Sequence, residues 1–83
     1  MTSKKNILQG VCYTDLVYKR INKKLGINYS NNDIENLVKK TVLEADKLDH
    51  KGKNYYIYDY TSNIRITINA NNFRVITAAK LKF

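Results

Sequence analysis

Apolar residues recur at helical spacing in two segments of the first half of the chain. The first segment spans residues 14–25 and is followed by Gly26, a residue that readily adopts the left-handed conformation ending a helix. The second begins after Ser30, and Asp33 completes a capping-box arrangement. It is expected to end before "DHKGK", which starts at Asp49. The apolar stripes of the two predicted helices are Tyr13, Leu16, Val17, Ile21 and Leu25, then Ile34, Leu37, Val38, Val42, Ala45 and Leu48.

The remaining third of the chain alternates apolar and polar residues with a period of two. Ile64, Ile66 and Ile68 alternate with polar residues, as in a half-buried strand. The loops "TSN" and "NANN" then divide residues 54–83 into a three-stranded antiparallel meander. The sequence therefore predicts one α+β domain over residues 1–83, of order α-α-β-β-β, with two helices on one sheet face. Residues 1–10 are expected to be loosely held or to form a short strand through residues 6–8.

The register of the strands decides which tyrosines face away from the helices. If Thr61 and Ser62 form the tip of the first hairpin, Tyr55 and Ile57 lie on the core side. In the third strand Val75 and Thr77 should join them, unless a bulge or a three-residue loop inverts the pattern. The residues expected to point away from the helices are Tyr56, Tyr58, Tyr60, Arg65, Thr67, Asn69, Arg74, Ile76, Ala78 and, further along, Lys80.

The formal net charge of +8 over 83 residues is high and uneven. Residues 1–26 and residues 51–83 each carry six cations and one carboxylate, whereas residues 27–50 carry three cations and five carboxylates. Such a balance attracts nucleic acid, an anionic membrane or an acidic protein. Four cations crowd the last two turns of the first predicted helix, where they either complement the helix dipole or bind phosphate. They are Lys19, Arg20, Lys23 and Lys24.

Several function classes lack their signatures. The single cysteine, Cys12, excludes an internal disulfide and a cysteine-based zinc site. The three glycines are isolated, so no phosphate-binding loop is present, and we expect neither a metal nor an organic cofactor. No apolar stretch could cross a bilayer and the amino terminus lacks a signal-peptide core, which predicts a cytoplasmic protein. The abundance of Asn, Lys, Ile and Tyr, which have AT-rich codons, suggests a low-GC bacterium or its phage.

Tyrosines interleaved with cations on one sheet face are suited to unstacked bases and phosphates, and they predict RNA binding. The nucleic-acid contacts expected besides the sheet are Lys19, Arg20, Lys23, Lys24, Lys53 and Tyr60. Metal-independent RNA cleavage also fits these residue types, because it needs proton transfer and a stabilised phosphorane. In that reading Tyr56 or Tyr58 transfers protons, Arg65 and Arg74 stabilise charge, and Lys80 or His50 assists.

Three other readings of the same face stay open. Tyrosine and arginine are enriched at protein interfaces, so the face could join a homodimer or a protein partner. A non-catalytic inhibitor from a phage or mobile element, docking on a nucleoprotein or an acidic protein, would also use it. A purely structural role is the third reading, since tyrosine is favoured in strands for its packing.

The segments "YTDLVYKRINKKLGI" and "GKNYYIYDYTSNIRITINANNFRVITAAKL" resemble a family of small bacterial proteins known as a domain of unknown function. This resemblance covers nearly the whole chain and implies no activity. More loosely, two helices followed by a meander ending in "FRVITAAK" are similar to toxin ribonucleases of the RelE and BrnT type. That resemblance implies a toxin-like endoribonuclease with a cognate protein inhibitor, and places Arg74 and Lys80 on a closing strand that approaches RNA.

Overall fold

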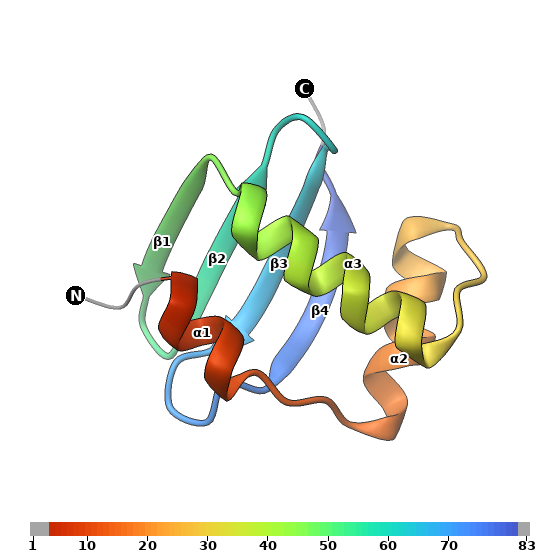
Figure 1. The fold of residues 1–83 in the computed structure, drawn as a ribbon, viewed down its shortest axis with the longest axis horizontal. Helices are drawn as coiled ribbons and strands as arrows, with labels where there is room; N and C mark the ends of the chain where they lie inside the picture. Colours follow the sequence, from red (N-terminus) through yellow and green to blue (C-terminus); the bar gives the residue numbers. More distant parts are fainter. Residues whose placement is uncertain (1–3, 82–83) are drawn as a thin grey trace.

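The computed structural model describes residues 4–81, and within them the chain forms three helices and one four-stranded antiparallel sheet. The strands follow the sequence order β1-β2-β3-β4, so each strand pairs with the one before it. Helices α1 and α3 lie over one face of the sheet, and α2 lies beside β4 (Figure 1). The elements are α1 (Lys4–Gly10), α2 (Asp15–Leu25), α3 (Asn31–Glu44), β1 (Lys47–Lys51), β2 (Asn54–Asp59), β3 (Ile64–Asn69) and β4 (Val75–Lys80).

The prediction of two helices on three strands was wrong, although the α+β class was right. Residues 4–10 form helix α1 instead of a loose segment or a strand, and residues 1–3 lie outside the described part. Ile7 of α1 is fully buried in the core, and Lys4 Nζ donates hydrogen bonds to the carbonyl oxygens of Leu43 and Ala45 at the end of α3. A helix this short has too few apolar positions for a periodic signal, and it depends on tertiary packing.

The strand "KLDHK" was missed because Lys47 and Leu48 were assigned to the preceding helix and residues 49–51 to the connection that follows it. Helix α3 ends at Glu44, and β1 begins three residues later. Leu48 continued the helical apolar stripe, yet in the structure it pairs with Ile57 of β2. The reversal between β1 and β2 occurs at Gly52, whose φ of 59° favours glycine. Pairing with β2, more than β propensity, therefore makes this polar segment a strand.

The predicted limits of α2 and the predicted start of α3 were close to those observed, whereas α3 ends at Glu44 and not just before Asp49. Gly26 ends α2 in the left-handed conformation, and Ser30 Oγ accepts a hydrogen bond of 3.2 Å from the Asp33 amide at the start of α3. Val17, Ile21 and Leu25 are buried as expected. Leu16 is 71% exposed, because it lies off the buried face of α2, so its place in the predicted stripe was wrong.

The first hairpin has the predicted register, whereas the third strand does not. Tyr55 pairs with Ile68 and Tyr58 with Arg65, as expected. Ile68 pairs with Val75 but Thr67 pairs with Thr77, so β4 contains a bulge at residue 76. From Thr77 onward the side chains of β4 are inverted relative to the prediction. Thr77 faces away from the core, while Ala78 and Lys80 lie on the helix side.

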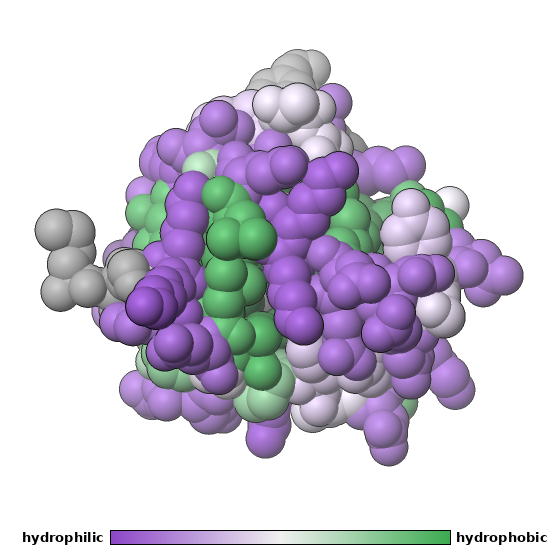
Figure 2. All heavy atoms as spheres, viewed as in Figure 1, coloured by the Kyte–Doolittle hydropathy of each residue, from purple (hydrophilic) through white to green (hydrophobic). Residues whose placement is uncertain are grey.

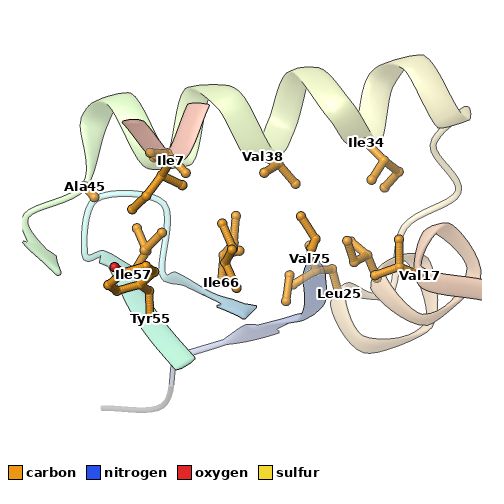
Figure 3. Close-up of a cluster of buried hydrophobic side chains, with 14 residues drawn as sticks. Ile7, Val17, Leu25, Ile34, Val38, Ala45, Tyr55, Ile57, Ile66 and Val75 are labelled. Atoms are coloured by element: carbon orange, nitrogen blue, oxygen red, sulfur yellow. The ribbon is translucent and has the colours of Figure 1, made fainter. Parts of the chain in front are cut away.

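The core fills the space between the helices and the sheet. Ile34 and Val38 of α3 point toward the sheet, where Ile57, Ile66 and Val75 point back (Figure 3). Every one of these five side chains is at most 1% exposed. Among residues 4–81, no helix is both long and apolar enough to cross a membrane.

Candidate nucleic-acid interface

The alternating strand residues that point away from α1 and α3 form a surface that we call the outer sheet face. Its parity follows from the register, because residues paired across strands share a face. Tyr56, Tyr58 and Arg65 on it are only partly exposed, and Thr67 at its centre is buried. The outer sheet face consists of Lys47, Asp49, Lys51, Asn54, Tyr56, Tyr58, Arg65, Thr67, Asn69, Thr77 and Ala79.

Cations of this face lie against its aromatic rings. The guanidinium carbon of Arg65 is 5.9 Å from the ring centroid of Tyr56, and Lys47 Nζ is 5.5 Å from that of Tyr58. Tyr60, just beyond β2, extends the row by stacking on Tyr58 with centroids 6.1 Å apart. Arg65 and Lys47 are thus each positioned by an aromatic ring. Such a cation–π contact stabilises by about 0.5–1 kcal/mol at an exposed site.

The face carries three cations and one carboxylate. That carboxylate, Asp49, accepts from Lys47 at 3.4 Å, and this hydrogen bond raises the pKa of Lys47. Arg65 forms no salt bridge within residues 4–81, and its buried Nε–H has no acceptor there. The guanidinium of Arg65 is therefore not neutralised by a protein carboxylate, and the face has a net positive charge.

The structure brings together only part of the predicted catalytic set. Tyr56, Tyr58 and Arg65 share the outer sheet face. Arg74 lies near the other end of β3, because its carbonyl accepts from the Asn69 amide, and Asn69 is four residues, or about 13 Å of strand, from Arg65. Arg65 and Arg74 therefore do not converge on one phosphate.

The other two candidates are on the opposite side of the sheet. Lys80 lines a cavity on the helix side, which the β4 bulge explains. His50 also points to that side, with its ring centroid 4.7 Å from that of Tyr55. Tyr56, Tyr58 and Arg65 therefore share one face, whereas Arg74, Lys80 and His50 lie elsewhere, and the full set predicted from the sequence does not come together.

The predicted cations of α2 do gather, forming what we call the α2 basic band. Lys19, Arg20, Lys23 and Lys24 are exposed and line a shallow hollow of ≈ 530 Å³. Arg20 Nη1 donates a hydrogen bond of 3.2 Å to the carbonyl of Ile76, which fixes the band to the bulge of β4. On the helix side of the molecule, hydrophobic residues form a continuous stripe near the middle, with hydrophilic residues on both sides of it (Figure 2).

Lys53, the remaining predicted contact, lies in the turn between β1 and β2 and is exposed. Its carbonyl accepts from the Ala70 amide at 2.7 Å, which places it at the end of the sheet away from Tyr58 and Tyr60. The residues that sequence reasoning missed are Lys47, Asp49 and Lys51 of β1. The signal that could have found them is Gly52, a turn residue between two segments of alternating side chains.

Within the described part of the chain, no group of three or more His, Cys, Asp or Glu side chains could hold a metal ion. A family model described as "Protein of unknown function (DUF3781)" matches residues 5–79. No curated protein and no solved structure matches the chain. The looser resemblance to RelE and BrnT toxins is therefore unsupported, and function has to be argued from the geometry.

Proposed function

We propose that this chain, which belongs to the DUF3781 family, binds single-stranded RNA through the outer sheet face. The observation that carries the proposal is the row of Tyr56, Tyr58 and Tyr60 with Arg65 and Lys47 packed against the rings. Helices α1 and α3 cover the other face of the sheet, so the row lies on the side away from them (Figure 1).

The chemistry of the row suits unpaired nucleotides. A base that stacks on an aromatic side chain gains about 1–3 kcal/mol, and it can do so only when it is not already stacked in a duplex. Arg65 and Lys47 stand beside the rings, where the phosphates of a bound strand would pass. Each phosphate that they neutralise releases counterions, so the affinity falls as salt rises.

The α2 basic band extends the same proposal. Helix α2 lies beside β4, and Thr77 and Ala79 present only small side chains on the outer face of β4. A strand that leaves the tyrosine row toward the α2 basic band would cross Thr77 and Ala79 on β4. The band would add sequence-independent affinity through phosphate contacts.

The proposal is limited to binding. Tyr56, Tyr58 and Arg65 are together, but Arg74 and Lys80 are on other surfaces, so the predicted catalytic set is not assembled at one place. An acidic protein or a nucleoprotein would be attracted by the same charges. A competition experiment shows whether such a protein uses the same site. Oligouridylate would displace a protein bound on the outer sheet face.

The experiment is fluorescence anisotropy with a labelled oligouridylate of about 12 nucleotides, titrated at several salt concentrations. Tyr60→Ala should weaken binding about tenfold, which corresponds to the loss of one stack. Tyr29→Ala is the matched control, because Tyr29 is 45% exposed and Tyr60 44%, and Tyr29 lies on the helix side. Binding that is insensitive to Tyr60→Ala, or that both variants weaken equally, would contradict the proposal.

A further inference from the structure

A cavity of ≈ 370 Å³ opens on the helix side of the sheet, away from the outer sheet face. It lies where the end of α2, the connection from α2 to α3, the turn between β2 and β3 and the end of β4 meet. Four of its lining residues are aliphatic and one is a tyrosine; the other three are polar or charged. The lining residues are Leu25, Ile27, Tyr29, Leu37, Ser62, Asn63, Ile64 and Lys80.

The walls of the cavity are held by hydrogen bonds that do not use its lining side chains. The side chain of Asn22 forms two hydrogen bonds with the backbone of Tyr29. Its Nδ2 donates to the Tyr29 carbonyl at 3.0 Å, and its Oδ1 accepts from the Tyr29 amide at 2.8 Å. Across the cavity, the Leu81 amide donates to the Asn63 carbonyl at 2.8 Å. The cavity is therefore a preformed feature of the fold, and its size is within the range of about 300–1,000 Å³ typical of ligand sites.

Among residues 4–81, Lys80 is the only charged residue that lines the cavity. It forms no salt bridge with any residue in the range 4–81. The carboxylate in the same row of the sheet is that of Asp59, which lies two strands from Lys80, or about 10 Å. Its Oδ1 accepts hydrogen bonds from the amides of Thr61 and Ser62. Lys80 thus lines the cavity with its Nζ near Gly26 at the end of α2, and the described lining contains no carboxylate.

We propose that this cavity binds a small organic anion, with an apolar or aromatic body against the aliphatic floor and one anionic group on Lys80. Charge complementarity selects the anion, because a cation would meet Lys80 and a dianion would leave one charge without a partner. Tyr29 at the rim would cover a planar body, and the side chains of Ser62 and Asn63 would bond to polar substituents. This site is independent of the RNA-binding proposal, since it uses the other side of the sheet.

The probes are naphthoate, naphthylmethanol and acetate, which carry the ring with the charge, the ring alone and the charge alone. Binding is measured by calorimetry and mapped by amide chemical shifts in NMR. We expect naphthoate to bind saturably, with shifts concentrated at Tyr29, Ser62, Asn63 and Ile64. Naphthylmethanol and acetate should each bind at least about tenfold more weakly, because each lacks one of the two interactions.

Variants test the role of the charge. Lys80→Gln should weaken naphthoate about tenfold, whereas Lys39→Gln, a change at an exposed lysine outside the cavity lining, should not. Asn63→Asp is a second variant that keeps Lys80 and adds a repelling carboxylate; Asp tolerates the φ of 59° found at Asn63. It should weaken naphthoate even if Lys80→Gln fails to fold.

The proposal is overturned if naphthoate shifts are scattered over the exposed lysines, if Lys39→Gln weakens binding as much as Lys80→Gln, or if no saturable binding occurs. Naphthylmethanol binding as tightly as naphthoate would also overturn it. The two tyrosine variants separate this site from the RNA site. Tyr29→Ala should weaken naphthoate and spare RNA, and Tyr60→Ala should do the reverse, so either proposal can fail alone.

Discussion

Ile66 of β3 pairs with Ala78 of β4, and both side chains are buried beneath the helices. This pairing exists only because β4 is bulged at residue 76. Ala78 is 1% exposed, so a larger side chain there would have to displace neighbours in a close-packed core. We expect Ala78→Leu to destabilise the protein by about 1–3 kcal/mol through overpacking.

The neighbouring position provides the control for that prediction. Ala79 pairs with Arg65 on the outer sheet face, so Ala79→Leu should change the free energy of unfolding by no more than about 0.5 kcal/mol. Urea denaturation of both variants measures the difference. If Ala79→Leu were the damaging change, β4 would have the unbulged register.

Lys4 takes the place of a basic residue that the last turn of α3 lacks. Its Nζ donates to the carbonyl oxygens of Leu43 at 3.2 Å and Ala45 at 2.7 Å. Lys4→Met should therefore lower the free energy of unfolding by about 1 kcal/mol, because the carbonyls at the helix end lose a cationic donor. Lys5→Met removes a charge from an exposed neighbour and should have little effect. Equal losses in the two variants, measured by urea denaturation, would contradict this role.

Because Tyr13 titrates, the free energy of unfolding depends on pH in the alkaline range. Burial, aided by the Glu35 carboxylate, raises the pKa of Tyr13 to about 12, above the unfolded value of about 10. The folded state therefore keeps a proton that the unfolded state loses between these two values. This contribution to stability is complete below pH of about 10 and declines as the pH rises toward about 12.

Tyr13→Phe isolates that contribution. The buried Tyr13 hydroxyl has no hydrogen-bond partner within residues 4–81, so its removal should leave stability unchanged or raise it by up to about 1 kcal/mol at neutral pH. Above pH of about 10, unfolding curves of the variant should decline less steeply than those of the unmodified chain. Parallel pH profiles would show that Tyr13 titrates normally.

Arg65 should carry one of the phosphate contacts on the outer sheet face. Arg65→Gln should weaken oligouridylate binding and reduce the slope of log affinity against log salt by about 0.7, the value for one contact with a single strand. Lys39→Gln, a change on the outer side of α3, should leave the slope as it is. Anisotropy titrations at several salt concentrations measure both slopes, and an unchanged slope in Arg65→Gln would exclude Arg65 from the RNA path.

The predictable parts of the fold were those with strong local signals. Alternation of Ile64, Ile66 and Ile68 fixed the register of the first hairpin, and Ser30 and Gly26 marked helix ends. No glycine in the sequence marks the bulge at residue 76. The predicted faces of the β4 side chains were therefore wrong from Thr77 onward. Strand β1 is polar and is stabilised by its partner β2, so its own residues have little strand propensity and only the turn at Gly52 indicates it.

The same reasons decided how much of the candidate site could be predicted. Tyr56, Tyr58 and Arg65 were placed together correctly because their register depends on the first hairpin alone. Lys80 was misplaced because a single inserted residue inverts every later side chain of a strand. Lys47 was missed because it was assigned to the end of the preceding helix.

The bridge between Cys12 and Arg74 joins the segment before α2 to the start of β4. All other strand pairings connect consecutive segments, and contacts so local in sequence favour rapid folding. The Cys12 bridge joins two segments that are far apart in the sequence. We infer that the hairpins, which connect consecutive segments, form before it.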